Sequence, residues 1–463
     1  MLTHHPVYQS VESTFSALAQ TVGLPSRIAV AYSGGLDSSV LLDAVAQYAA
    51  RNGITLCALH IHHGISPYAD QWQTHCANTC AQLNIELFTQ KITLHNAQKQ
   101  GLEEAARISR YAALGALCRQ HQIACLLTAH HLDDQAETVL LQLLRGAGTA
   151  GLSSMDRWNS AASLLGDATV LMVRPLLNVS RAVMEAYAIA QQLTYVEDES
   201  NQDLRYARNV LRQQVMPVLG NYFPGFQERF SRSAQHMQSA QKLLIDLAEH
   251  DLARYSDDTG LNLTHLRQLD DARIDNLLRY WLGKHNLRMP SFAWLSEMRQ
   301  QLLEAKPDAQ LCVTHPQCHI QRYRDHIFLT PRNADIAVKN DVEIFQWDGQ
   351  NALYFSKFGG TLHFDQQEYG LAAAWLRQTP LCMTYRTGGE RMKLAPNRST
   401  KSLKYHYQAS AVPPWERARL PLIKHDKQVL FAAGIGMDCH HISSEPGIHI
   451  CLRWQADEIS LKK

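Results

Sequence analysis

The chain has 463 residues, of which 46% are hydrophobic and 19% are charged, a composition that can bury sizeable cores and is not that of a disordered protein. Its 44 basic and 43 acidic residues almost cancel, so the net charge gives no indication of a nucleic-acid partner. We expect a cytoplasmic protein, because the sequence has neither a long uncharged apolar run nor the basic-then-apolar start of a secretory signal.

Residues 1–215 alternate apolar, strand-like runs with amphipathic helical stretches, which is typical of a parallel sheet. The predicted strands are 27–33, 55–62, 85–92, 123–129 and 169–176. This region therefore predicts a doubly wound α/β domain over residues 1–220, whose ligand lies beyond the carboxyl ends of the strands.

A glycine pair stands directly after the first predicted strand and opens a helix. The segment reads Ser33-Gly34-Gly35-Leu36-Asp37-Ser38. Consecutive glycines allow a tight turn and a close approach of the backbone to a ligand, and the N–H groups of a helix start bind phosphate. The chain has no G-x-x-x-x-G-K-[ST] motif, so this is not a P-loop. An ordinary glycine turn with an Asp or Ser N-cap is the alternative.

A second polar motif, HHLDDQAET, follows the predicted strand 123–129. Asp134 and Glu137 are three residues apart in it, so they share a helix face. Two carboxylates at this edge of the sheet can hold an ammonium group and take its proton. Helix capping, with Asp133 as the N-cap, is the alternative, and the two roles can coexist.

Two further segments carry arginines at helical spacing. Arg110 lies on a predicted helix, GLEEAARISRYAALGALCRQ, whose Glu–Arg spacing is also that of a salt-bridged helix. Arg205, Arg208 and Arg212 follow at spacings of three and four and so share a face. Guanidinium groups on one face are suited to a phosphate or an anionic reaction centre, although an ordinary charged helix gives the same pattern.

After Pro217 the pattern changes. Helical periodicity predicts a mostly helical domain over 221–345. Short strand-like runs appear between 311 and 370, as a linker or as part of a neighbouring domain, and renewed strand signals predict a small α+β domain over 375–463.

A basic stripe lies in this terminal region. Between Tyr385 and Lys424, nine basic residues stand against two acidic ones. The basic residues are Arg386, Arg391, Lys393, Arg398, Lys401, Lys404, Arg417, Arg419 and Lys424. Such a stripe predicts a face that contacts phosphate, although a solvated surface gives the same pattern. Trp415 is either a stacking group for RNA or part of a core.

The SGGLDS segment resembles the pyrophosphate loop of the PP-loop (N-type ATP pyrophosphatase) superfamily, whose members cut ATP between the α- and β-phosphates. Together with HHLDDQAET, DESNQDLRYARNVLR, the RTGGERMKLAP segment and KSLKYHYQASAVPPWERARLPL, it makes the chain similar to the tRNA(Ile)-lysidine synthase family over nearly its whole length. The resemblance implies that ATP first adenylates the C2 oxygen of the wobble cytidine in the CAU anticodon of a minor tRNA(Ile). The amine of free L-lysine then attacks C2, and AMP leaves.

The resemblance also implies roles for single residues. Ser33 to Ser38 would bind the pyrophosphate, and Asp37 would arrange Mg²⁺ and the phosphates. Arg208 would contact the reacting phosphate or AMP, and Arg110 would hold the substrate. The lysine amine has a pKa of ~10.4, so a carboxylate has to bind it and take its proton. These tasks fall to Asp134 and Glu137.

The sequence leaves three points open. A PP-loop tRNA thiolase is one alternative, which the absence of any C-x-x-C pair disfavours. A catalytically idle ATP- and RNA-binding protein is another, which the intact polar motifs disfavour. The oligomeric state, including a homodimer, is not fixed by the sequence.

Overall fold

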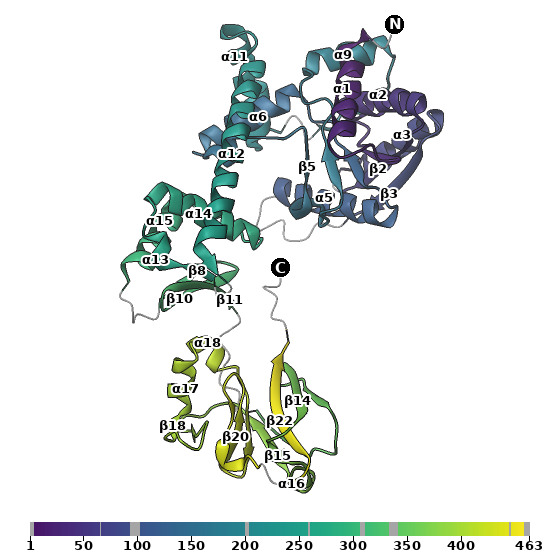
Figure 1. Ribbon diagram of the computed structural model, residues 1–463. Coiled ribbons are helices and arrows are strands. Elements are labelled where there is room, and N and C mark those ends of the chain that lie inside the picture. Colours follow the sequence, from purple (N-terminus) through teal and green to yellow (C-terminus); the bar gives the residue numbers. More distant parts are fainter. Residues whose placement is uncertain are drawn as a thin grey trace. The chain divides into compact units, whose positions relative to one another are not determined.

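The computed structural model describes residues 4–64, 66–92, 102–199, 203–257, 260–305, 311–332, 341–443 and 446–457. The chain divides into two compact units, residues 1–247 and 248–463 (Figure 1). No helix among these residues combines the length and apolarity that a membrane span needs.

The first unit is built on a six-stranded sheet with the order β3-β2-β1-β4-β6-β5. In that order the strands are Glu86–Lys91, Thr55–His62, Arg27–Ala31, Cys125–Leu127, Leu171–Val173 and Trp158–Ser160. All neighbours are parallel except β5, which runs antiparallel to β6. The five predicted strands are confirmed, and the short edge strand β5 was not predicted.

Helices cover both faces of this sheet (Figure 1). The side chains of Ile28 and Val30 in β1 pack on one face with α1 (Pro6–Thr21), α2 (Leu36–Asn52) and α9 (Arg181–Ala190). Ala29, which points to the opposite face, packs with α5 (Leu102–Gln120). Burial on both faces explains why the strands are continuously apolar, and it confirms the doubly wound α/β class.

Shorter elements complete the first unit. They are α3 (Ala69–Gln82), α6 (Leu132–Leu144), α7 (Thr149–Leu152), α8 (Ala162–Leu165), α10 (Ala207–Val210), the π-helix η3 (Leu211–Val215) and α11 (Met216–Tyr222). The long helix α12 (Phe226–Tyr255) follows, and Phe226 packs with Met216 against Ala136 of α6. This contact fixes the segment that carries Arg208 and Arg212 beside α6.

The second unit begins with a helical and β region. A five-stranded sheet has the order β7-β8-β11-β10-β9. In that order its strands are Ser256–Asp257, Gly260–Asn262, His326–Pro331, Cys318–Tyr323 and Cys312–Thr314. The helices α13 (Leu263–Leu266), α14 (Asp271–Lys284) and α15 (Phe292–Glu304) pack on it through one aliphatic core. The helical prediction is therefore confirmed, with a small sheet added.

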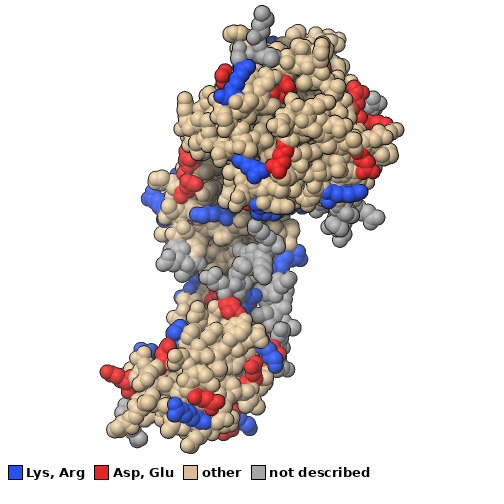
Figure 2. Space-filling model, turned by 90° about the vertical axis from the view of Figure 1, so that its right-hand side faces the viewer, with Lys and Arg blue, Asp and Glu red and all other residues tan. Residues whose placement is uncertain are grey.

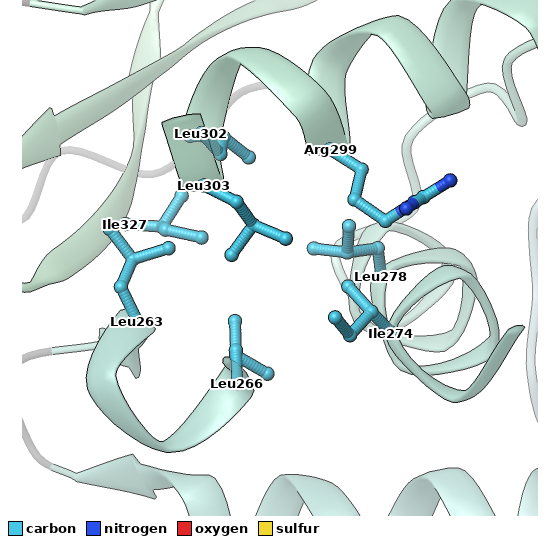
Figure 3. A pocket seen from close by; sticks show the side chains of 8 residues that line it. All are labelled: Leu263, Leu266, Ile274, Leu278, Arg299, Leu302, Leu303 and Ile327. Carbon is cyan, nitrogen blue, oxygen red and sulfur yellow. The ribbon is translucent and has the colours of Figure 1, made fainter. Parts of the chain in front are cut away.

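Figure 3 shows a pocket inside this core. Seven aliphatic side chains line it, and the guanidinium group of Arg299 points away from them. Arg299 instead pairs with Asp271 and with Asp275, whose Oδ1 lies 2.8 Å from its Nε. The pocket thus offers a ligand no polar group, and we regard it as a packing feature.

The remaining part of the second unit contains two sheets that share one core. The first, β12-β16-β19-β20-β21, is formed by Val342–Phe345, Leu381–Thr384, Leu422–His425, Gln428–Ala432 and Gly436–Met437. The second, β13-β14-β22-β15, is formed by Ala352–Phe355, Gly360–Gln367, His449–Ala456 and Leu371–Ala372. The boundary at residue 375 therefore lies inside this fold, because strands from 342 to 372 pair with strands that follow it.

Small elements decorate these two sheets. They are α16 (Ala373–Gln378), the hairpin β17 (Arg391–Met392) and β18 (Lys401–Ser402), α17 (Leu403–Ala409), α18 (Pro414–Arg417) and the 3-10 turn η5 (Cys439–His441). A second small core, containing Met392, Leu403 and Tyr407, holds the hairpin and α17 in place. The basic stripe runs along these elements.

Candidate active site

The turn between β1 and α2 is shaped by one glycine. Gly34 has a φ of +85°, and a Cβ atom there would lie 3.0 Å from Cys76 Sγ and 3.3 Å from Val196 Cγ2. Both the backbone conformation and the available space therefore require glycine. Gly35 is the N-cap of α2, and among the described residues no side chain caps it. The first N–H groups of α2 are thus available to an anion.

Ser33 and Ser38 brace this turn. Their hydroxyl oxygens lie 3.1 Å apart, and Ser38 Oγ also donates to Gly35 O at 3.0 Å and accepts from Ser33 N at 3.3 Å. Leu36 is buried at the first position of the helix. The hydroxyl groups hold the shape of the loop, which leaves backbone N–H groups as its main anion donors.

Helix α6 begins directly after β4, at the carboxyl edge of the sheet. Its N-cap is His131, whose N–H donates to Asp134 Oδ2 at 3.1 Å. Asp133, the N-cap considered from the sequence, lies in the first turn instead, and its Oδ2 accepts from Arg181 N at 2.8 Å. The cap falls earlier than expected because the chain stays extended through His131, with φ −128° and ψ −178°.

Two arginines hold the two carboxylates of α6. Glu137, whose side chain is 1% exposed, accepts from Arg208 Nε at 2.7 Å and from Arg212 Nε at 2.7 Å. Asp134 Oδ1 accepts one hydrogen bond from Nη2 of Arg208 and one from Nη2 of Arg212, both at 3.1 Å. Such charge-assisted bonds are the strong class of hydrogen bond in proteins. Arg205 is not part of this group, because it pairs with Asp203 and is 85% exposed.

His131 connects these carboxylates to the glycine turn. Its Nε2 lies 3.7 Å from Asp37 Oδ2 and 3.4 Å from Asp134 Oδ2, and its Nδ1 lies 3.6 Å from Asp133 Oδ2. Burial lowers the pKa of His131, but the three carboxylates outweigh this effect and raise it to about 10. We therefore treat the ring as an imidazolium at neutral pH, so that its 3.4 Å contact with Asp134 N is not a hydrogen bond.

The pKa values of Asp133 and Asp134 shift in the opposite direction. Burial raises the pKa of Asp134, yet the charges of His131 and the arginines prevail and hold it at about 2. Asp134 is therefore ionised at neutral pH and, in this arrangement, a weak proton acceptor. Asp37 is partly exposed and lies 4.0 Å from Arg181 Nη1.

Arg110 acts on this region at longer range. It is exposed, and its guanidinium carbon lies 5.3 Å from the ring centroid of Tyr111. Burial lowers the pKa of His63 to about 4 and that of His130 to about 3, and the charge of Arg110 contributes to both shifts. Arg110 therefore lies within electrostatic reach of the strand ends that border the site.

The structure thus gathers most of the residues expected from the sequence. Asp37, Asp134, Glu137 and Arg208 belong to one connected group, whereas Arg110 contributes by charge alone.

Three further members were not assigned from the sequence: His131, Arg181 and Arg212. The two adjacent histidines before the Asp pair pointed to His131. The spacing of four residues from Arg208 pointed to Arg212. Arg181 carried no signal, because its approach to Asp37 depends on the position of α9.

The basic stripe of the terminal region is less uniform than its sequence suggests. Arg417 is buried and donates to Val412 O at 2.7 Å and to Tyr323 Oη at 2.9 Å. Lys424 lies 3.4 Å from Glu390. Exposed members, among them Arg398, remain available to phosphate. On the face drawn in Figure 2, basic and acidic side chains are interspersed among the described residues.

Trp415 packs against aromatic neighbours. Its ring centroid lies 5.4 Å from that of Phe328 and 6.1 Å from that of Tyr323. Of the two roles considered from the sequence, these contacts favour packing.

Comparison with known proteins gives three matching families along the chain. Residues 7–219 match a family described as PP-loop domain. Residues 261–328 match the TilS substrate binding domain, and residues 381–454 match the TilS substrate C-terminal domain.

Whole proteins are also similar to this chain over most of their length. The tRNA(Ile)-lysidine synthase of Ralstonia nicotianae is 40% identical over 443 residues, covering 94% of each chain. That of Alkalilimnicola ehrlichii is 36% identical over 445 residues, covering 96% of this chain and 97% of the relative. Among solved structures, the U34-tRNA thiolase NcsA from Methanococcus maripaludis has a TM-score of 0.42 at 18% identity, covering 50% of this chain and 78% of that one. On the identity and coverage of these curated relatives, the chain belongs to the tRNA(Ile)-lysidine synthase family.

Proposed function

We propose that the chain uses ATP to adenylate the wobble cytidine of a CAU anticodon in a minor tRNA(Ile) and then joins free L-lysine to its C2. The products are lysidine, AMP and pyrophosphate, and the codon read by the tRNA changes from AUG to AUA. One observation carries the proposal: Asp37 after β1 and the carboxylates after β4 meet around His131 at the carboxyl edge of the parallel sheet. Ligands of such sheets bind at this edge.

For the first step we assign the turn from Ser33 to Ser38 to the pyrophosphate. The N–H groups at the start of α2 and its positive dipole end favour an anion there. Asp37 Oδ1 is buried and has no hydrogen-bond partner among the described residues, which fits a ligand to Mg²⁺. The ion would supply positive charge to the phosphates, and Asp37 would orient it.

Arg208 would stabilise the negative charge that develops at the α-phosphate. Its guanidinium is already at the site, where it is bound to Asp134 and Glu137. Asp134 and Glu137 would receive the ammonium group of lysine and take its proton. We expect at least one arginine to move away first, because His131 and the arginines together hold the pKa of Asp134 low.

The outer regions would bind the rest of the tRNA. We assign this task to residues 221–345 and 375–463, with exposed cations such as Arg398 and Lys404 on phosphates. The wobble base would have to leave its stack to reach the carboxyl edge of the sheet. A homodimer stays a prediction.

The test supplies labelled L-lysine, ATP, Mg²⁺ and a minor tRNA(Ile) with a CAU anticodon. We expect lysine in the RNA, with one pyrophosphate released per residue incorporated. Asp37→Ala should lose AMP transfer, because the metal and phosphates lose their oriented carboxylate. Release of ADP and phosphate, or full activity of Asp37→Ala, would contradict the proposal.

A further inference from the structure

The carboxylates assigned to lysine already accept three hydrogen bonds each from described residues. Glu137 Oε1 accepts from Arg212 Nε, and Glu137 Oε2 accepts from Arg208 Nε and from Arg212 Nη2 at 3.0 Å. Asp134 Oδ1 accepts from both arginines, and its Oδ2 accepts from His131 N. A lysine ammonium brings three more donors and no acceptor. It therefore competes with the arginines for this carboxylate pair (Asp134 and Glu137), above all for Glu137 Oε2 and Asp134 Oδ1, which already accept two hydrogen bonds each.

The arginine pair (Arg208 and Arg212) lies on the solvent side of the carboxylates. The arginine side chains are 34% and 30% exposed, whereas those of Asp134 and Glu137 are 12% and 1% exposed. The guanidinium groups occupy acceptor positions on both carboxylates. The arginine pair blocks the carboxylate pair in both space and charge.

The charges of the carboxylate pair and the arginine pair balance each other. Two carboxylates, from Asp134 and Glu137, face two guanidinium groups, from Arg208 and Arg212. Adding a lysine cation alone would leave an excess of positive charge at a buried site, which is costly. Adding the phosphates of a nucleotide as well would compensate for it.

The two arginines differ in how firmly they hold the carboxylates. Arg212 makes three hydrogen bonds to the carboxylate pair, and Arg208 makes two. Arg212 lies within the π-helix η3, and such irregular turns are frequent at functional sites. Arg208 lies before it, on the four-residue helix α10. Arg208 is thus the arginine with fewer bonds to break, and it is the one assigned to phosphate.

We propose that the arginine pair couples lysine binding to nucleotide binding. Nucleotide phosphate draws Arg208 away from the carboxylate pair, and the ammonium group of lysine takes its place on Glu137 Oε2 and Asp134 Oδ1. Arg212 remains and keeps both carboxylates in position, so it is a positioning residue for lysine. The inference rests on the proposed function and adds an order of binding to it. The chain binds lysine firmly only after the nucleotide has bound.

Equilibrium dialysis of labelled L-lysine against the full chain tests the coupling. It is measured with Mg²⁺ alone and with Mg²⁺ plus α,β-methylene-ATP, which cannot be cut between the α- and β-phosphates. We expect lysine to bind at least ~10-fold more tightly with the analogue, within the usual range for coupled sites. The analogue should also bind more tightly, by the same factor, when lysine is present. Equal lysine affinity in both conditions would overturn the proposal without recourse to any variant.

Variants locate the coupling in the arginine pair. Arg208→Gln should bind lysine with little dependence on the analogue, because the carboxylates are no longer blocked. Arg212→Ala should bind lysine more weakly with the analogue present, and Arg212→Lys should recover part of the loss. Arg205→Ala is the matched control, since Arg205 pairs only with Asp203 in the described structure. In this variant the analogue should increase lysine affinity by the same factor as in the wild type. If the analogue increased the lysine affinity of Arg208→Gln as much as that of the wild type, the proposal would be overturned.

The coupling and the function fail in different ways. Lysine incorporation into tRNA together with equal lysine affinities would reject the coupling and leave the function intact. Absence of incorporation from the wild-type chain, with intact minor tRNA, would reject the function itself.

Discussion

Arg212 and Glu137 are joined as a fork, with Nε to Oε1 at 2.7 Å and Nη2 to Oε2 at 3.0 Å, on a carboxylate that is 1% exposed. Breaking one side of a buried ion pair leaves an uncompensated charge and typically costs about 3–5 kcal/mol. This relationship makes Glu137 important for stability as well as for the proposed lysine site.

Glu137→Gln should therefore affect both properties. We expect the free energy of unfolding to fall by about 3–5 kcal/mol and the KM for lysine to rise at least ~10-fold. Denaturant titration and steady-state incorporation assays measure the two effects. Glu104→Gln is the control, because its partner Arg107 is exposed and such surface pairs contribute about 0–1 kcal/mol. An unchanged dependence on lysine would remove Glu137 from the amine site.

Gly34→Ala should damage nucleotide binding. The positive φ costs an alanine about 1–2 kcal/mol, and the added methyl group meets Cys76 Sγ at 3.0 Å. We expect the KM for ATP to rise at least ~10-fold in a pyrophosphate-release assay. Gly148→Ala should be silent, because φ is −78° there and no described atom lies within 4 Å of the added Cβ. Equal ATP affinity in both variants would contradict the role of the turn.

Glu390 should make the terminal region sensitive to acid. Burial raises its pKa, but hydrogen bonds from Thr387 and the charge of Lys424 prevail and hold it at about 2, below the ordinary value of 4.5. A carboxyl group with a lowered pKa contributes stability above pH 4.5, and this contribution is lost as the pH falls toward 2. Wild type should thus exceed Glu390→Gln in stability at about pH 7, and the difference should shrink by about pH 3. Urea titrations that gave the same stability difference between wild type and Glu390→Gln at all pH values in this range would refute the lowered pKa of Glu390.

Two arginines of the basic stripe should behave differently. Arg398→Ala should weaken tRNA binding and lower the dependence of log affinity on log salt by about 1, as expected for one lost phosphate contact. Arg417→Ala should instead lower the melting temperature, because the buried guanidinium bonds Val412 O and Tyr323 Oη. Binding at several salt concentrations and thermal unfolding separate the two. A wild-type melting temperature for Arg417→Ala would contradict its structural role.

The α/β domain was predictable because its signals are local. Each predicted strand is an apolar run, and each observed strand lies within the predicted range, as for β1 at Arg27–Ala31 within 27–33. The turn at Gly34 was equally visible, because two adjacent glycines directly after an apolar strand strongly favour a tight turn. The strand β5 at Trp158–Ser160 has only three residues and no alternation, so it left no readable pattern.

The site was predictable in part of its membership but not in its pairing. Asp134 and Glu137 were identified from spacing, and Arg208 from spacing together with the family resemblance. Their contacts depend on how η3 packs beside α6, which spacing does not encode. The role of Arg417 was hidden for a related reason. A basic stripe in sequence does not tell which guanidinium groups turn inward.

The strand β22 at His449–Ala456 has a consequence for synthesis of the protein. It lies between β14 and β15, so the sheet whose first strand starts at Ala352 is completed only when β22 has been translated. A ribosome that stops before His449 would release a chain with the nucleotide-binding sheet complete and β14 left with an open edge. Such an edge readily pairs with other chains. Nonsense or frameshift changes near this position should therefore yield aggregated product instead of a shortened, partly active enzyme.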